Sequence, residues 1–463
     1  MNRLLISGTH SGCGKTTVTC AALSAIKARG LTPTAFKCGP DYIDTLFHRS
    51  VSGVAAYTLD PFFLDGEGLR GHLAAHAGAI SVIEGAMGYY DGIAETDEAS
   101  AYTVARETRT SAVLTVNARG AGRSHGAVMQ GFLRYKKDSG IAGVIFNNAS
   151  EERYPGLKKL ALEAGVKTYG FLPHNREWEL PSRRLGLFAA EEIKNIQNIL
   201  FELGRQAEQT LDMDGLLALA ASAPGYALAQ NKPADRVSPA ARALIAVSRD
   251  PAFCFMYEEN LALLRALGGE IIFFSPLSGE KLPENISGLY LCGGYPEEHA
   301  KALSENITMR QSIKRAAERG LPMIAEGGGF LYLHETLDGF PMCGVINGAA
   351  FKTGRLRRFG YLTLTAESGN LLCEAGESIR AHEFHYWESD AQGEGFTARK
   401  AGRDLIYKCA HATDALYAGF PQLFFPANPV FAGNFVKACL KTAEKFAETG
   451  GMYHEFSGSA AKN

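Results

Sequence analysis

The sequence predicts an α/β fold with two doubly wound parallel sheets, one in each half of the 463-residue chain. The first observation is that apolar runs typical of buried strands alternate with segments of helical periodicity. The second is that this alternation stops near residue 193, gives way to an Ala-, Pro- and Asn-rich stretch, and resumes near residue 241. The third is a glycine-rich loop directly after the first apolar run. Ligands in such folds are expected at the carboxyl ends of the strands.

We expect six strands in the first half and four in the second. They are 4–7, 34–37, 80–83, 112–116, 143–146 and 167–171, then 243–248, 271–274, 289–292 and 323–325. A helix is expected over 16–29, because Val18, Ala22 and Ile26 repeat at helical spacing and Gly30 suits a C-cap. The expected organisation is a domain over 1–193, a helical and then irregular linker over 194–240, a second domain over 241–446 and a polar tail over 447–463.

The composition is that of a soluble enzyme. The net charge is −2 and no basic block stands out, which argues against a nucleic-acid or membrane partner. No apolar segment approaches the 18 residues of a membrane span, and the first residues lack the zones of a signal peptide. The nine cysteines include no C-x-x-C pair, so we expect reduced thiols, no zinc site and a cytoplasmic location.

The glycine-rich loop is Gly8-Thr-His-Ser-Gly-Cys-Gly-Lys-Thr-Thr17. A strand, such a loop and a helix start together cradle phosphate groups with backbone N–H groups, as in a P-loop NTPase-type sheet. The spacing is unusual, because Gly8 lies one residue too early for G-x-x-x-x-G-K-[ST]. Lys15 would reach the β- and γ-phosphates and Thr16 would bind Mg²⁺. The nucleotide-binding residues predicted here are Gly12, Gly14, Lys15, Thr16 and Thr17.

Four carboxylates follow neighbouring strands of the same sheet. Asp41 and Asp44 lie in the segment after the second strand, together with Lys37, and Glu84 ends the next strand with Asp91 seven residues on. Phosphoryl transfer needs Mg²⁺ held by oxygen ligands and cations around the migrating group. Any one of these carboxylates alone would be an ordinary loop residue. Together with a P-loop on the same sheet edge, they favour a nucleotide site.

The sequence resembles the cobyrinic acid a,c-diamide synthase family of corrinoid biosynthesis over residues 1 to about 445. The matching motifs are Gly8–Thr17, Phe36–Asp44, Val82–Gly92, Asn117–Gly120, Gly143–Asn147, Leu180–Leu187, Ser248–Phe255 and Phe273–Leu277. An early P-loop glycine of this kind is also seen in dethiobiotin synthetase, whose ATP-binding domain the family shares.

The resemblance implies an ATP-dependent amide ligase. ATP would phosphorylate an acetate side chain of a tetrapyrrole, and ammonia would displace phosphate from the acyl phosphate. Lys15 and Lys37 would stabilise the transferring phosphoryl group, and Mg²⁺ would be held by Thr16, Asp41 and Glu84. Asp91 would act near the activated carboxylate or the attacking ammonia, and Asn147 would contact the adenine. The substrate contacts considered are Tyr42, Asp44, Arg183, Arg184, His382 and His385, and a solvated Arg pair is an equal alternative for Arg183 and Arg184.

The second domain resembles a class I glutamine amidotransferase domain, whose sheet we also expect to be doubly wound. It departs from that pattern at two positions. Gly327, in Ala325-Glu-Gly-Gly-Gly329, stands where the family has a nucleophilic cysteine, and Gln422 stands where its catalytic histidine is expected. We therefore expect no glutaminase activity, because neither side chain can do Cys–His chemistry. Cys292 is the alternative nucleophile, although a strand-end cysteine is more often a buried hydrophobe.

Three functions stay open from the sequence. The first is amidation of cobyrinate-type acetates with free ammonia or ammonia from a separate glutaminase. The second is amidation of another carboxylated tetrapyrrole, such as Ni-sirohydrochlorin or sirohaem. The third is a non-catalytic protein that binds a tetrapyrrole under control of ATP. The macrocycle, a family-like homodimer and the effect of Asn117, where relatives would have Asp, are also left open.

Overall fold

The computed structural model describes all residues except 51, 179–189, 227–241 and 449–463. The chain divides into two compact units. The first comprises Met1–Asn231 with the short segments Tyr257–Glu259 and Ala401–Asp404, and the second comprises the remaining residues. The domain boundaries at 193 and 240 stay a prediction, and the first unit takes in the two helices over Ala190–Thr210 and Met213–Ala221, which cover much of the expected linker.

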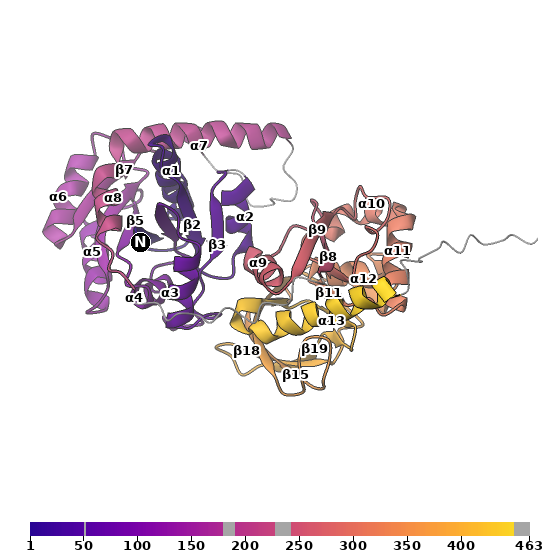
Figure 1. Ribbon diagram of the computed structural model, residues 1–463. Coiled ribbons are helices and arrows are strands. Elements are labelled where there is room, and N and C mark those ends of the chain that lie inside the picture. Colours follow the sequence, from indigo (N-terminus) through magenta and orange to yellow (C-terminus); the bar gives the residue numbers. More distant parts are fainter. Residues whose placement is uncertain (51, 179–189, 227–241, 449–463) are drawn as a thin grey trace, which may run out of the picture. The chain divides into compact units, whose positions relative to one another are not determined.

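A seven-stranded sheet forms the centre of the first unit, in the order β3-β2-β4-β1-β5-β6-β7 (Figure 1). All of its pairings are parallel, which confirms the predicted fold class. The strands are β1 (Arg3–Gly8), β2 (Pro33–Lys37), β3 (Ala55–Thr58), β4 (Ile80–Glu84), β5 (Ala112–Asn117), β6 (Ile141–Asn147) and β7 (Lys167–Leu172). The sequence analysis missed β3, because this four-residue edge strand alternates between exposed and buried side chains.

The helices of the first unit cover this sheet. They are α1 (Lys15–Ala28), α2 (Tyr42–Ser50), α3 (Gly66–Ala75), α4 (Ala101–Glu107), α5 (Ser124–Tyr135), α6 (Tyr154–Ala164), α7 (Ala190–Thr210) and α8 (Met213–Ala221), with a short 3₁₀ turn η1 (Arg176–Trp178). In α7, Ile196, Leu200 and Leu203 follow helical spacing and are buried in one cluster with Val18 and Ala22 of α1. The expected linker therefore begins as a helix that packs on the first unit.

A six-stranded sheet lies in the second unit, in the order β20-β21-β11-β10-β8-β9. It is parallel except for the edge strand β20. Its strands are β8 (Ala243–Ser248), β9 (Gly269–Phe274), β10 (Gly288–Leu291), β11 (Met323–Glu326), β20 (His411–Ala412) and β21 (Leu416–Gly419). The first four were predicted from their apolar runs.

Two further sheets in this unit were not predicted. One is a mixed sheet of β13 (Phe340–Pro341), β12 (His334–Leu337), β14 (Ile346–Lys352) and β17 (Trp387–Ser389). The other is an antiparallel sheet of β19 (Ile406–Cys409), β18 (Phe396–Lys400), β15 (Arg358–Ala366), β16 (Ser378–His385) and β22 (Gln422–Leu423). These strands are half-exposed and several are very short, so they lack the continuous apolar runs of buried parallel strands.

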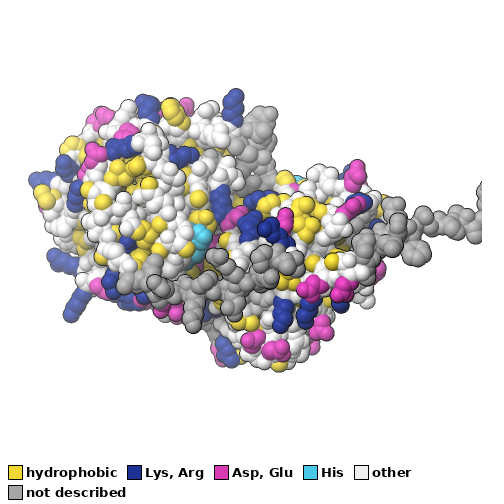
Figure 2. Space-filling view, viewed as in Figure 1, with side chains coloured by type: hydrophobic (Ala, Val, Ile, Leu, Met, Phe, Trp, Pro, Cys, Tyr) yellow, Lys and Arg dark blue, Asp and Glu magenta, His cyan; other side chains and the backbone are white. Residues whose placement is uncertain are grey.

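The helices of the second unit complete the fold. They are α9 (Glu258–Ala266), α10 (Ala300–Glu305), α11 (Ile307–Glu318), α12 (Gly328–Leu333) and α13 (Pro429–Glu448), with 3₁₀ turns η3 (Pro296–His299) and η4 (Phe425–Ala427). Among the described residues, no helix combines the length and apolar character that a membrane span requires. On the face shown in Figure 2, acidic and basic side chains are interspersed on each unit.

Candidate functional site

The P-loop joins β1 to α1. Gly14 precedes the helix with φ 99° and ψ 23°, a left-handed conformation that glycine adopts without strain. The side chain of Lys15, the first helical residue, folds back so that its Nζ donates to the carbonyl oxygen of His10, 3.1 Å away. The lysine ammonium therefore lies against the loop whose N–H groups would bind phosphates.

Asn147 supports this loop from the end of β6. Its Nδ2 donates to the carbonyl oxygen of Cys13 at 3.1 Å, and its side chain is buried. A Cβ atom at Gly14 would overlap the Asn147 amide, so this position needs glycine for space as well as for its φ. The contact of Asn147 with adenine stays a prediction.

Glu84, at the end of β4, is the centre of a buried polar cluster. Its Oε1 accepts hydrogen bonds from Thr16 Oγ1 at 2.7 Å and from Lys37 Nζ at 3.0 Å. Its Oε2 lies 3.0 Å from Nε2 of His48. Lys37 also forms an ion pair with Asp44, with 2.6 Å between Nζ and Oδ2. The cluster brings together residues that follow β1, β2 and β4, which end at one edge of the sheet.

The charges of this cluster support one another. Burial opposes ionisation of Glu84, but the Lys37 ammonium and the hydrogen bonds from His48 and Thr16 outweigh it, so the pKa of Glu84 lies well below its ordinary value. Burial likewise opposes the charged form of Lys37, but Asp44 and Glu84 raise its pKa above the ordinary value. Both groups are therefore charged at neutral pH.

His48 is the member of the cluster that the sequence analysis missed. It lies on α2, one helical turn after Asp44, and is 1% exposed. Residues four apart share a helix face, so the Asp44–His48 spacing was the available signal. The imidazole contacts the Glu84 oxygen that Thr16 and Lys37 leave unoccupied.

The other residues of the segment after β2 have structural contacts. Asp41 Oδ1 accepts hydrogen bonds from the backbone N–H groups of Ile43 and Asp44, both at 3.1 Å, and so caps the start of α2. Tyr42 and Asp44, considered as substrate contacts, are both buried. Their direct contact with a substrate stays a prediction, and so does Mg²⁺ binding by Asp41.

Asp91 lies exposed on a loop that is tied to the P-loop. Its Oδ2 accepts from the N–H of Gly88 at 2.8 Å, and the N–H of Tyr89 donates to the carbonyl oxygen of Gly8 at 2.9 Å. Three non-glycine residues of this loop have positive φ angles, namely Met87 (48°), Ala94 (52°) and Ala99 (62°). Strained backbone of this kind collects at functional sites, which agrees with the role expected for the loop.

These residues fit a nucleotide and Mg²⁺ chemically. The Thr16 hydroxyl and the Glu84 carboxylate are hard oxygen donors of the kind that Mg²⁺ binds, and they lie beside Lys15 at a helix start. Within the described part of the chain, no three His, Cys, Asp or Glu side chains are grouped to hold a metal by themselves. Magnesium at this site would therefore share its coordination with phosphate oxygens and water, as it does in phosphoryl-transfer enzymes.

The second unit contains another sharp strand-to-helix turn, at Gly327 between β11 and α12. Gly327 has φ 50° and ψ −107°, a conformation that strains other residues. Its N–H donates to the carbonyl oxygen of Gly419 at 2.9 Å, and its own carbonyl accepts from the N–H of Leu331 at 3.1 Å. An exposed nucleophile on such a turn is the nucleophile-elbow arrangement, and here the turn carries no side chain.

Gln422 fills the space beside this turn. A Cβ atom built at Gly327 would lie 3.3 Å from Gln422 Nε2. Gln422 Oε1 is buried, and among the described residues it has no hydrogen-bond partner. The two positions that depart from the glutaminase pattern are therefore neighbours in space.

Each of the two units matches the model of a known protein family. Residues 4–187 match the CobQ/CobB/MinD/ParA nucleotide binding domain, and residues 244–408 match the CobB/CobQ-like glutamine amidotransferase domain. The cobyrinate a,c-diamide synthase of Listeria innocua is 39% identical, covering 93% of this chain and 97% of its own. The synthase of Caldanaerobacter subterraneus is 37% identical, and the match covers 90% of this chain and 94% of that protein. The synthase of Thermoplasma volcanium is 35% identical, and the match covers 96% of this chain and 98% of that protein.

The chain belongs to the cobyrinate a,c-diamide synthase family.

Cys292, the alternative nucleophile in this member of the family, lies in the core. Its side chain is 0% exposed, and its backbone N–H donates to Ser248 Oγ at 2.9 Å. Burial, reinforced by the nearby Glu326 carboxylate, raises the pKa of the Cys292 thiol well above its ordinary value. A protonated, enclosed thiol is a poor nucleophile.

His382 and His385, the two histidines considered as substrate contacts, have different environments. His382 lies opposite Gln422 in the pairing of β16 with β22, and neither of its ring nitrogens has a hydrogen-bond partner among the described residues. Burial, with a smaller contribution from Lys400, lowers the pKa of His382 to about 3. His385 Nδ1 lies 2.6 Å from the carbonyl oxygen of Trp387, and its ring stacks on Phe420. Arg183 and Arg184 lie outside the described residues.

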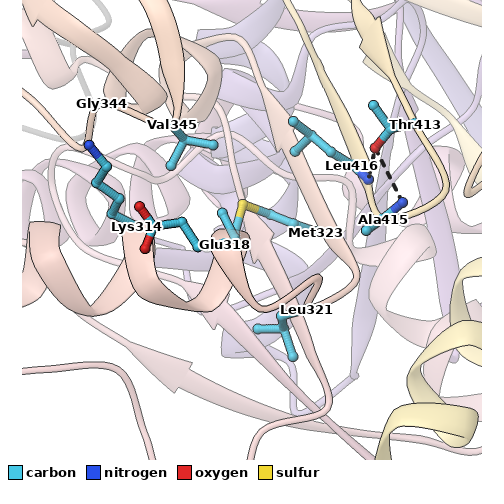
Figure 3. A pocket seen from close by; sticks show the side chains of 10 residues that line it. Lys314, Glu318, Leu321, Met323, Gly344, Val345, Thr413, Ala415 and Leu416 are labelled. Carbon is cyan, nitrogen blue, oxygen red and sulfur yellow. Dashed lines mark hydrogen bonds between the residues drawn. The ribbon is translucent and has the colours of Figure 1, made fainter.

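A cavity of about 280 Å³ in the amidotransferase-like unit is separate from the Gly327 turn. Figure 3 shows its lining, including Lys314, Met323 and Leu416. Met323 and Leu416 are the first residues of β11 and β21, whereas Gly327 follows the other end of β11. Thr413 Oγ1 accepts from the backbone N–H groups of Ala415 and Leu416 at its rim, as the dashed lines show.

Proposed function

We propose that this chain is an ATP- and Mg²⁺-dependent amide ligase that converts peripheral acetate groups of a cobyrinate-type tetrapyrrole into amides. The observation that carries the proposal is the buried cluster at the sheet edge, in which Thr16, Lys37 and Glu84 meet directly beside Lys15. The carboxylate of Glu84 and the ammonium groups of Lys37 and Lys15 match the needs of phosphoryl transfer. The names of the relatives supply the substrate class.

The proposed reaction has two steps. An oxygen of the substrate acetate attacks the γ-phosphorus of ATP, the bond to the leaving ADP oxygen breaks, and an acyl phosphate forms. The nitrogen of ammonia then attacks the acyl carbon, phosphate leaves, and the amide nitrogen loses a proton. Lys15 would stabilise the charge that develops on the phosphoryl oxygens. Lys37 would keep Glu84 ionised and oriented, and Thr16 and Glu84 would hold Mg²⁺.

Asp91 would act on the second step. Its exposed carboxylate lies on the loop tied to Gly8, so it is available to the acceptor while the buried residues serve the nucleotide. We assign to it the orientation of the acetate or of the attacking ammonia.

The nitrogen donor would be free ammonia or ammonia from a separate glutaminase. Gly327 offers no thiol, Gln422 cannot accept a proton at neutral pH, and Cys292 is enclosed. Only neutral NH₃ has the lone pair that attacks an acyl phosphate. Amide formation with ammonium salts should therefore rise with pH.

The test is a turnover assay with the purified chain, MgATP and a tetrapyrrole acid, in which ADP release is followed and the products are identified by mass. Cobyrinic acid, Ni-sirohydrochlorin and sirohaem would be compared, each with ammonium and with glutamine as nitrogen source. We expect two amidations of cobyrinic acid with ammonium and no reaction with glutamine. Amidation only of another macrocycle would change the substrate, and tight binding without ADP release would favour a non-catalytic binding protein.

A further inference from the structure

The antiparallel sheet of the second unit has two unlike faces. Side chains alternate between the faces of a strand, and Leu362, Leu364 and Ala381 are fully buried on one face. On the other face, Phe359 pairs directly with Phe384, and Tyr361 pairs with His382. This second face carries aromatic residues where a solvated sheet face normally carries polar ones.

The aromatic residues of this face form a connected and exposed cluster. Phe359, Phe384 and Tyr386 are 59%, 39% and 48% exposed. The ring centroids of Phe359 and Phe384 are 5.6 Å apart, and those of Phe384 and Tyr386 are 5.7 Å apart. We call Phe359, Tyr361, Phe384 and Tyr386 the aromatic face. An exposed apolar cluster of this kind marks a binding surface more often than a scattered exposed residue does.

His382 lies beneath the aromatic face and is 4% exposed. Its ring packs edge-on against Phe359 and Tyr361, with centroids 5.6 and 6.0 Å away. Neither ring nitrogen has a hydrogen-bond partner within the described part of the chain. The imidazole therefore contributes to this face by ring packing, and not through a hydrogen bond to another described residue.

A basic segment borders the aromatic face. Residues 352–358 contain Lys352, Arg355, Arg357 and Arg358. Arg357 pairs with Glu388, and the Arg358 guanidinium lies over the ring of Tyr407. Lys352 and Arg355 are exposed, and no ion pair joins either of them to another described residue. Their charges are therefore available to an anionic ligand.

We propose that the aromatic face binds the macrocycle of the carboxylated tetrapyrrole, with its peripheral carboxylates on Lys352 and Arg355. The proposal rests on the proposed function for the class of ligand. A conjugated ring system stacks on aromatic side chains, and its carboxylates pair with guanidinium and ammonium groups. The charge of the segment 352–358 complements such a ligand, whereas a neutral apolar partner would leave these cations without a counterpart.

The experiment is a titration of the full chain without ATP, in which the absorbance change of cobyrinic acid reports binding. The doubly substituted F359A/F384A variant removes the centre of the face, and Arg355→Ala removes one cation. We expect the double variant to bind cobyrinic acid at least about tenfold more weakly. Arg355→Ala should weaken binding severalfold, and it should leave binding of the fully amidated macrocycle unchanged.

The matched controls are Phe340→Ala on β13, which is 39% exposed in the same unit, and Arg319→Ala after α11. Both should bind cobyrinic acid like the parent chain. Nucleotide binding, measured with a fluorescent ATP analogue, should be the same in all variants and separates this proposal from the proposed function. Binding that depends on the aromatic face would support the inference even if no amidation occurs.

Two results would overturn the proposal. One is unchanged affinity for cobyrinic acid in F359A/F384A at the native mass of the parent, whether or not the parent chain amidates it. The other is a fall in native mass in the double variant with unchanged affinity, which would make the aromatic face a contact between two copies of the chain.

Discussion

The two strand-to-helix turns of this protein, at Gly14 and at Gly327, differ in what surrounds them. Around the first, Thr16, Lys37 and Glu84 form a mutually bonded and charged cluster. Around the second, the backbone hydrogen bonds of a sharp strand-to-helix turn are present, but Gly327 has no side chain and the amide of Gln422 lies beside it. The comparison teaches that one kind of backbone turn carries a charged side-chain cluster in the first unit and a residue without a side chain in the second.

The cause is physical and local. A glycine adopts φ 50° more easily than a cysteine does, so Gly327 holds this turn without the strain that a cysteine would carry there. Gln422 Oε1 is buried and has no hydrogen-bond partner among the described residues, which costs about 1–3 kcal/mol. Beside the Gly14 turn, loss of the side-chain charge of either Lys37 or Glu84 would leave the other as an uncompensated buried charge. That costs far more.

The largest effect is expected at the first turn, from Lys15→Ala. Loss of a positioned charge on the transferring phosphoryl group should lower ATP-dependent amidation by about 100- to 1,000-fold. Rates of ADP release would be measured beside Lys158→Ala, an exposed lysine on α6 of the same unit. An unchanged rate in Lys15→Ala would remove the P-loop from the mechanism.

Glu84→Gln should have the next largest effect. The amide keeps the size of the side chain but loses the charge that would attract Mg²⁺, so the Mg²⁺ concentration for half-maximal rate should rise about tenfold. Asp91→Asn is the companion variant, because its carboxylate is exposed and separate from the cluster. It should reduce amide formation more than nucleotide affinity. A parent-like Mg²⁺ requirement in Glu84→Gln would contradict its role as a ligand.

The same contrast explains what the sequence could predict. Six strands of the first sheet are largely apolar runs, and the loops after β1, β2 and β4 necessarily share one edge, so the meeting of Thr16, Lys37 and Glu84 was foreseeable. For His48 the only signal was its spacing from Asp44, because its contact with Glu84 depends on how α2 packs. The antiparallel sheets were missed because short, half-exposed strands give weak patterns.

The candidate site in the second unit was predictable only in part. Gly327 and Gln422 were identified as departures from a pattern of residue types, which the sequence states directly. That their atoms are neighbours, and that the turn keeps φ 50°, depends on the pairing of β16 with β22 and on the end of β11. The pairing of Phe359 with Phe384 likewise depends on a register that no local pattern specifies.

A smaller effect is expected beside the second turn, at Glu326. Burial raises the pKa of this carboxyl to about 7, although the N–H of Leu423 and the hydroxyl of Tyr290 donate to it. The folded state therefore holds the proton more tightly than the unfolded state, whose carboxyl titrates near 4.5. Stability from this group is complete below that value and is lost as pH rises through about 7.

Glu326→Gln replaces the neutral carboxyl by a neutral amide and should remove this loss. Between pH 5 and pH 8, the free energy of unfolding of the parent should fall relative to that of the variant by about 2–3 kcal/mol. Denaturant unfolding at the two pH values measures it, with Glu318→Gln on the exposed side of α11 as control. Parallel pH profiles for the parent and Glu326→Gln would show that Glu326 is ionised in the folded protein.

The smallest effect is expected from restoring the elbow. Gly327→Cys alone should release no glutamate from glutamine, because a thiol without a base stays protonated at neutral pH. The new side chain would also crowd Gln422 Nε2 and take up φ 50° at a cost of about 1–3 kcal/mol. Combining it with Gln422→His supplies a base at the neighbouring position and should give weak glutamate release, measured with a coupled dehydrogenase assay. The parent and Cys292→Ser should both release none. Glutamate release by the parent that disappears in Cys292→Ser would mean that the enclosed thiol opens to solvent and acts as the nucleophile, and the contrast between the two turns would then be one of position and not of lost chemistry.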